Sequence, residues 1–269
     1  MSVRPLHQAV RPSPIFLAIV AITAAGGVVA WFSSPSSPVA SLAPGQIRPL
    51  AYVGVFVFVI FGWLVSLCLH EFGHAYTAWR FGDRDVALRG YLTLNPLKYS
   101  HPLLSLGLPV LFIALGGIGL PGGAVYVQTA SMTTRQKTLV SLAGPAVNLL
   151  FAVGILTTIR LLYDPAHSVF WAGMAFLGFL QVTALLLNML PIPGLDGYGA
   201  LEPHLSRETR RALQPAKQWG FFILLILLIA PPLNQWFFGA VYWLFDLSGV
   251  PAALSAAGGQ LTRFWSAWL

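Results

Sequence analysis

The chain has 269 residues, of which 57% are hydrophobic and only 9% are charged, and its formal net charge is +7. Soluble domains carry about 25% charged residues to solvate their surface, so this composition excludes a soluble globular protein, a disordered protein and a nucleic-acid-binding protein. The single cysteine, Cys68, excludes a disulfide framework and a cysteine-based metal site. The sequence therefore predicts a membrane protein.

Six stretches without Asp, Glu, Lys or Arg have about the length of 20 residues that a bilayer core requires. They are 15–32, 49–69, 102–121, 138–159, 168–195 and 218–245. We expect an all-α polytopic membrane protein with five or six transmembrane helices. The composition shows no linker that would divide it, so we expect one membrane-embedded domain over 1–269, with its core at 49–200 and a tail at 250–269.

The first stretch, 15–32, follows Arg4 and Arg11 and could be a signal peptide or a retained anchor. It is longer than the 7–15 apolar residues of a signal peptide, which favours the anchor. Basic residues also concentrate after the second, third and fifth stretches. The positive-inside rule therefore places the N-terminus and these connections in the cytoplasm, and we expect a multi-pass protein of the plasma membrane.

The third stretch, 102–121, is the one that we expect not to cross the bilayer. The second and fifth stretches both end at cytoplasmic connections, so only one of the two stretches between them can cross. The third contains Pro109 and several glycines and continues into Gly122 and Gly123. Such a segment suits a re-entrant loop that is buried in protein or lines a wet cavity. The β-prone run 124–128 favours a short strand there, as part of a candidate β-hairpin.

The last stretch, 218–245, has Pro231 and Pro232 near its middle. Because proline removes a helical hydrogen bond and clashes with the preceding turn, we expect two short helices rather than one. The tail at 250–269 is predicted to be an interfacial helix.

The inner end of the second stretch carries His70, Glu71 and His74, in the run HEFGH. Residues four apart lie on one face of a helix, so the two imidazoles can bind one cation. Glu71 lies about 100° further round the helix and can reach a metal-bound water as a general base. This is the H-E-x-x-H pattern of zinc proteases. Ionisable residues in a membrane span are costly and are functional candidates by default.

A catalytic zinc requires a third protein ligand and an open position. Most acidic residues lie in polar connections or beside arginines, which leaves Asp196 at the inner end of the fifth stretch. Prolines and glycines surround it, so the backbone must unwind there and can turn the carboxylate toward a site. The alternative is a turn aspartate that caps a loop after the span.

Three motifs in order, HEFGH, GPAVN and NMLPIPGLDG, resemble the site-2 protease family of intramembrane zinc metalloproteases. Residues 188–197 match the family's N-x-x-P-x-P-x-x-D-G signature at every fixed position. The resemblance covers about half of the chain, and it is to the short members of the family, which have no PDZ domain. It implies that His70, His74 and Asp196 bind one zinc ion, with Glu71 as the base and Asn188 as a stabiliser of the oxyanion.

Substrate contacts are predicted at Asn148 of GPAVN and at Gly122 and Gly123 of the inserted loop. Short members of the family often carry a Lys-Pro-Val-Pro-like run near this loop, where the chain has LPGGAVYVQ. The expected reaction is hydrolysis of a peptide bond in or near the transmembrane segment of a membrane protein. The expected partners are that substrate and the lipid bilayer, without nucleic acid. The alternatives are another membrane H-E-x-x-H peptidase, such as a prenyl-protein protease, and a non-catalytic binding protein.

Overall fold

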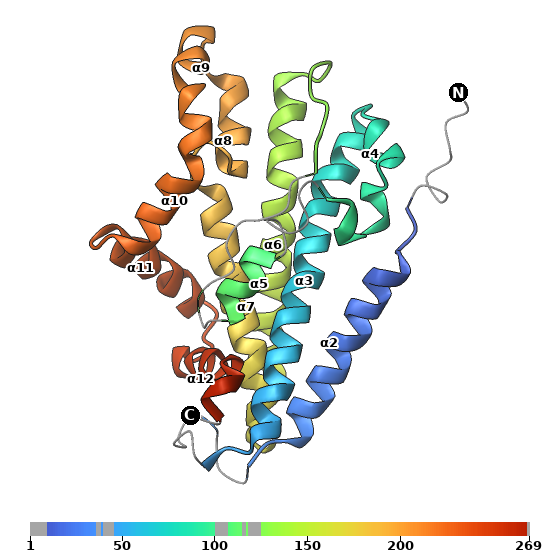
Figure 1. Ribbon diagram of the computed structural model, residues 1–269. Coiled ribbons are helices and arrows are strands. Elements are labelled where there is room, and N and C mark those ends of the chain that lie inside the picture. The colour runs from blue at the N-terminus through green and yellow to red at the C-terminus, as the bar shows by residue number, and fades with distance from the viewer. Residues whose placement is uncertain are drawn as a thin grey trace.

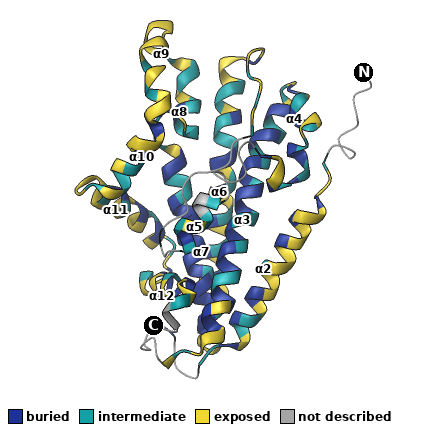
Figure 2. Cartoon of the chain, viewed as in Figure 1, coloured by how far each residue is buried: buried dark blue, intermediate teal, exposed yellow. Residues whose placement is uncertain are grey.

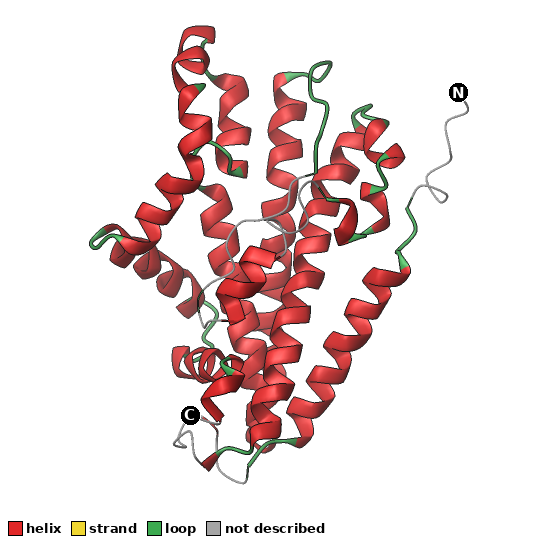
Figure 3. Ribbon diagram, viewed as in Figure 1, coloured by secondary structure: helices red, strands yellow, loops and turns green. Residues whose placement is uncertain are grey.

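In the computed structural model, residues 10–35, 39, 46–99, 107–114, 117 and 125–267 are described. They form helices joined by loops and contain no β-strand (Figure 3). The α-helices are α2 (Pro14–Phe32), α3 (Pro49–Arg80), α4 (Asp85–Leu88), α5 (Leu108–Ala114), α6 (Thr134–Leu162), α7 (Ser168–Met189), α8 (Asp196–Leu201), α9 (Arg207–Leu213), α10 (Gly220–Ile229), α11 (Leu233–Asp246) and α12 (Ala252–Thr262). Short 3-10 helices are η3 (Tyr91–Thr93), η4 (Pro96–Lys98), η6 (Pro165–His167), η7 (Glu202–His204), η8 (Pro215–Trp219) and η9 (Phe264–Ala267).

Within the described residues, five helical segments are long and apolar enough to cross a membrane. They are Pro14–Phe32, Pro49–Arg80, Thr134–Leu162, Pro165–Met189 and Arg207–Ile229. The protein is therefore an all-α, multi-pass membrane protein, as the sequence predicts.

Helices α2, α3, α6 and α7 run alternately down and up the bundle (Figure 1). The end of α3, the start of α6 and the helices α8 and α9 consequently lie at one end of the molecule. This arrangement agrees with the prediction that 102–121 does not cross, since α3 ends and α6 begins on the same side. The described helix in the stretch 102–121 is α5, which has seven residues. Its length of about 10 Å is much shorter than the hydrocarbon core, which is about 30 Å thick.

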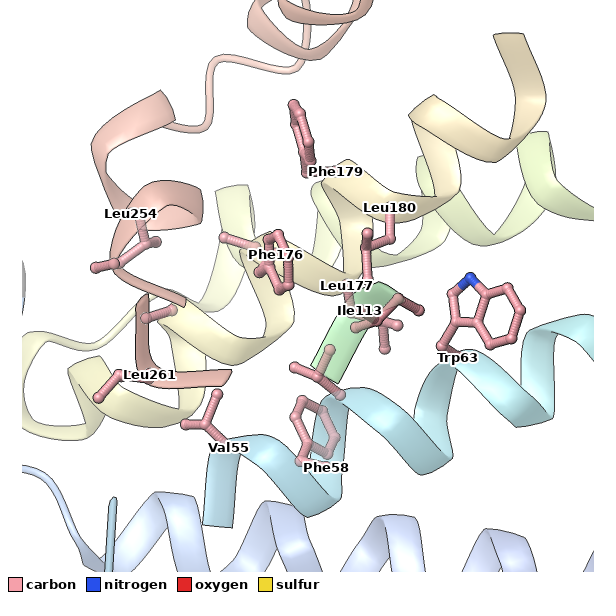
Figure 4. Packing of buried hydrophobic residues seen from close by; sticks show 14 of the residues in the cluster. Val55, Phe58, Trp63, Ile113, Phe176, Leu177, Phe179, Leu180, Leu254 and Leu261 are labelled. Atoms are coloured by element: carbon pink, nitrogen blue, oxygen red, sulfur yellow. The ribbon is translucent and has the colours of Figure 1, made fainter. Parts of the chain in front are cut away.

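The centre of the bundle is formed by α3 and α7, which are the most buried of the candidate spans (Figure 2). Side chains of α3 such as Phe58 and Trp63 face Phe176 and Leu180 of α7 (Figure 4). Lipid tails are as apolar as leucine, so contact in a bilayer comes from close packing rather than from hydrophobic exclusion. The outer helix α10, by contrast, has many exposed apolar side chains.

The contact of α2 with α3 depends on two glycines. A Cβ added to Gly26 would lie 2.6 Å from the backbone N of Phe58, and one added to Gly54 would lie 2.8 Å from that of Ala30. The two backbones therefore approach more closely than any larger residue permits. Glycine at these two positions therefore allows the close packing of α2 against α3.

The C-terminal third of the chain differs in one respect from what the sequence predicts. The stretch 218–245 does form two helices, α10 and α11, which are separated at Pro231 and Pro232. The tail also packs against the bundle, which the sequence does not predict: α12 contacts α7 and α3 and buries Leu254 and Leu261 (Figure 4). The tail contains the small residues that allow this packing: Gly258 meets the carbonyl of Ala172 so closely that a Cβ would overlap it.

The candidate β-hairpin is not found in the described residues, where 125–129 form a loop without a strand. Gly122, Gly123 and the first residue of the predicted strand lie outside the described residues.

Candidate metal centre

Helix α3 carries both histidines of the HEFGH motif on one face, as their spacing of four residues predicts. His70 and His74 are buried, and 3.1 Å separates their Nε2 atoms. A single helix therefore supplies two imidazole nitrogens directed at one point in space.

The loop after α7 brings Asp196 to the same point. Helix α7 ends at Met189, and Gly194 takes a φ of +103° that residues with a side chain rarely adopt. The chain then restarts as α8 with Asp196 as its first residue. Its two carboxylate oxygens lie 3.2 Å from His70 Nε2 and 3.3 Å from His74 Nε2.

The fit of these three residues to a zinc ion follows from their separations. Ligands about 2.0–2.1 Å from a tetrahedral zinc lie about 3.3 Å apart. The two Nε2 atoms are 3.1 Å apart, and the two carboxylate oxygens of Asp196 lie 3.2 Å from His70 Nε2 and 3.3 Å from His74 Nε2, respectively. Asp196 Oδ2 is buried without a hydrogen-bond partner among the described residues. An unpartnered buried carboxylate oxygen is costly, and a bound cation would satisfy it. The three side chains form one group of metal-ligating type.

Burial by itself raises the pKa of the Asp196 carboxyl, but its contacts with His74 and His70 outweigh burial and hold that pKa below its usual value. The ionised carboxylate is the form that binds a cation.

Helix α6 leaves space for the ion at Gly144. A Cβ built on this glycine would overlap His74 Nε2 and lie 2.5 Å from His70 Nε2. The next residue, Pro145, lies inside α6. Only a residue without a side chain leaves the two nitrogens open on this side.

The other ring nitrogen of each histidine is held from behind. His74 Nδ1 lies 2.7 Å from the backbone oxygen of Val140, and His70 Nδ1 lies 2.6 Å from Asn148 Oδ1. Both acceptors are on α6. Metal-binding histidines commonly donate their second N–H in this way, which leaves the first nitrogen free for the metal.

Glu71 is buried beside the three residues but is not a member of the ligating group. Its Oε2 accepts a hydrogen bond from the backbone N–H of Val125, at 3.0 Å. The segment that follows the glycine-rich loop is therefore hydrogen-bonded directly to the predicted base.

The residues of the site line a cavity of about 550 Å³. Its wall includes Glu71, Asn188 and Asn148, so each predicted site residue within the described chain reaches the same space. Gly122 and Gly123 lie outside the described residues. The wall also takes in Lys217, Phe221 and Leu224, where η8 and α10 pass beside Asp196.

Sequence reasoning missed several residues that shape the site. Gly144 is the first residue of the GPAVN motif, but the motif does not reveal that this glycine contacts the two histidines. Val140 contacts His74 through its backbone oxygen, which no side-chain pattern indicates. Gln181 is the one residue with an amide side chain that precedes Asn188 in the span 168–189. A lone amide in a membrane span was the available signal for Gln181.

No protein-family model matches the chain, and no solved structure matches it. The chain is 70% identical to the "Putative zinc metalloprotease Rip2" of Mycolicibacterium smegmatis, over the full length of both chains. It is 66% identical to the protein of the same name from Mycobacterium tuberculosis, again over the full length of both. It is also 31% identical to the "Putative zinc metalloprotease YwhC" of Bacillus subtilis, over 62% of this chain and 78% of that one.

Proposed function

Because the chain belongs to the site-2 protease family of zinc metalloproteases, we propose that it hydrolyses a peptide bond in or beside the transmembrane segment of a membrane protein. The observation that carries this proposal is the depth of the site. His70, Glu71 and His74 lie in the last third of α3, inside a segment that can span the membrane. A substrate must therefore reach the cavity between helices of the bundle.

His70, His74 and Asp196 are the residues that would hold the zinc ion. When bound, zinc acts as a Lewis acid that activates water and polarises a carbonyl group. The protein's own part is to keep two neutral imidazoles and one carboxylate at the separations of a tetrahedral site, which α3, α8 and the open face at Gly144 achieve together.

Glu71 is the proposed general base. Its Oε2 is held by the Val125 N–H, so its other oxygen can take a proton from the attacking water and return it to the leaving amine. Asn188 lies on the wall of the same cavity. An amide at that place can donate a hydrogen bond to the oxygen of the scissile carbonyl as negative charge develops there.

The substrate must be extended at the cleaved bond, because a helix occupies its own carbonyl groups in i to i−4 hydrogen bonds. The loop at 125–129 borders the cavity, with Val125, Val127 and Thr129 in the cavity wall. We propose that it holds the unwound segment by strand addition, together with Gly122 and Gly123.

The basic connections lie at the end of the bundle that carries the site, so the positive-inside rule supports a cytoplasmic site in the plasma membrane. Cleavage there would release a cytoplasmic fragment of a membrane protein, which is the chemistry of regulated intramembrane proteolysis.

The test compares membranes that contain the active chain with membranes that contain its Glu71→Gln form, in a host that lacks the protein. We expect single-span membrane proteins that are intact with Glu71→Gln and truncated within or beside their span with the active chain. Truncation only at lipidated C-termini would favour a prenyl-protein protease, and identical protein profiles would favour a non-catalytic binding protein.

A further inference from the structure

A chain of buried polar side chains lies behind His70, away from the metal-binding face. His70 Nδ1 contacts Asn148 Oδ1 at 2.6 Å, and Asn148 Nδ2 contacts Gln181 Oε1 at 2.9 Å. Gln181 Nε2 contacts Ser66 Oγ at 2.8 Å, and Ser66 Oγ contacts the backbone oxygen of Trp63, also at 2.8 Å. This amide relay, His70–Asn148–Gln181–Ser66, connects α3 to α6 and α7 and returns to α3.

The direction of every other hydrogen bond in the amide relay follows once the Ser66 hydroxyl donates to the Trp63 carbonyl. The Trp63 carbonyl can only accept, so Ser66 donates to it and accepts from the Gln181 amide group. Gln181 then presents its oxygen to Asn148, and Asn148 presents its oxygen to His70. At the end of the series, His70 Nδ1 must carry the hydrogen, which leaves the lone pair of Nε2 facing Asp196 and His74.

The reverse direction is unfavourable at the histidine end. It would place a hydrogen on His70 Nε2, whereas the Trp63 carbonyl lies inside α3 and keeps its helical partner in either direction. That hydrogen would occupy the space where the Nε2 atoms and Asp196 converge within 3.2 Å. Reversal of a single amide would instead set two donors or two acceptors against each other.

Burial makes the relay costly to disturb. Gln181 has no exposed surface, and Ser66 and Asn148 are nearly as deeply buried. An unsatisfied polar group in such surroundings is costly. Gln181 does not line the cavity, so water cannot readily replace a partner that it loses. Each amide in the series is therefore held by its neighbours on both sides.

The two histidines are held by different means. His74 donates to the Val140 backbone oxygen, which no substitution removes. His70 has only a side chain behind it, and that side chain is oriented by a second amide. The tautomer of His70 is therefore the one that depends on side-chain identity.

We propose that Asn148 and Gln181 are positioning residues of the metal centre, which fix the ring and tautomer of His70 through the amide relay. This inference rests on the proposed zinc chemistry of His70, His74 and Asp196. It gives Asn148 a task different from the substrate contact expected from its motif, because both polar atoms of its side chain are occupied by His70 and Gln181.

The test measures the zinc affinity of the full-length protein in detergent, by competition with a chelator. We expect Asn148→Leu to weaken zinc binding about 10- to 100-fold, as loss of an outer-shell partner does at other metal sites. Gln181 contacts Asn148 and Ser66 but neither histidine. We therefore expect Gln181→Leu to weaken zinc binding by a factor near the lower end of that range. It also supplies the test if Asn148→Leu does not yield folded protein.

Conservative and control variants separate positioning from simple packing. Asn148→Asp should retain affinity, since a carboxylate accepts the hydrogen of His70 Nδ1. Gln181 can turn to donate to that carboxylate, because the Ser66 hydroxyl can rotate from the Trp63 carbonyl and donate to the turned amide oxygen. Thr183→Val is the matched control, because Thr183 is fully buried on α7 like Gln181 but donates only to the Phe179 carbonyl of its own helix. Its zinc affinity should equal that of the unsubstituted protein.

A second readout is the visible absorption spectrum of the cobalt-substituted protein, which reports the geometry of the ligands. We expect it to change with Asn148→Leu and Gln181→Leu but not with Asn148→Asp or Thr183→Val. Unchanged affinity and spectrum in both leucine variants would overturn the inference while the proposed function stands. An unsubstituted protein that binds no zinc would overturn both.

Discussion

The backbone N–H of Val125 donates to Glu71 Oε2 across 3.0 Å, although 54 residues separate the two along the chain. The bond connects the predicted base on α3 to the segment that follows the glycine-rich loop. Glu71 thus has one carboxylate oxygen bound to the Val125 N–H, and in the proposed mechanism its other oxygen takes the proton.

Replacing Val125 with proline removes that hydrogen and should lower the rate of substrate cleavage. A hydrogen bond to a charged group contributes about 1.5–3 kcal/mol, so we expect roughly a 10- to 100-fold loss in rate with zinc affinity unchanged. The measurement is cleavage of a single-span substrate by purified protein in detergent. Val125→Ala is the matched control, because it changes the side chain at the same position and keeps the backbone N–H. Equal rates for the two variants would contradict a specific role for the bond.

Replacing Gly144 with alanine should abolish zinc binding. The new methyl group would overlap the Nε2 atoms of His74 and His70, although alanine favours a helix by about 1 kcal/mol over glycine. We therefore expect a folded protein without metal, measured as zinc content after purification. Gly154→Ala is the control on the same helix, because a Cβ there meets nothing within 4 Å. Full zinc content in Gly144→Ala would show that the metal does not lie on the α6 side of the histidines.

Much of this arrangement could be predicted from the sequence because the relevant patterns are local. The spacing of His70 and His74 sets them on one face of a helix, and the prolines before Asp196 indicate an unwound segment. The lack of charges identifies the spans, and the positions of Arg and Lys indicate the common end at which α3 ends and α6 begins. Each of these signals operates over a few residues or a single span.

The rest depends on contacts between residues far apart in the chain. The docking of α12 was missed because its small residues matter only once they meet α7, and a short apolar tail also suits an interfacial helix. The contact of Gly144 with the histidines and the amide relay of Gln181 both arise from the packing of α3, α6 and α7. No spacing within one motif encodes them.

Removing the metal should abolish cleavage reversibly. A chelator strips the ion, and we expect added zinc to restore activity to the unsubstituted protein but not to Asp196→Ala, which lacks one of the three converging ligands. The measurement is zinc content and cleavage before and after treatment. Asp246→Ala is the control, since Asp246 is exposed at the end of α11 and should behave as the unsubstituted protein does. Full zinc content and activity in Asp196→Ala would point to another third ligand and favour the prenyl-protein protease alternative.

Replacing Gly26 with alanine should destabilise the contact of α2 with α3. The added methyl group would lie 2.6 Å from Phe58 N, and backbone atoms cannot turn aside as a flexible side chain can. Overpacking of this kind costs about 1–3 kcal/mol, to be measured by thermal unfolding in detergent. Gly239→Ala, in open space on α11, should leave stability unchanged or slightly raised.

A double substitution sharpens this prediction. Gly54→Ala obstructs the same interface from the α3 side, where its Cβ would lie 2.8 Å from Ala30 N. Once one methyl group has forced the helices apart, the second meets less resistance. The combined loss of stability should therefore be smaller than the sum of the two single losses, as is usual for residues that share a contact. Fully additive losses would show that α2 and α3 do not share one close-packed interface at these glycines.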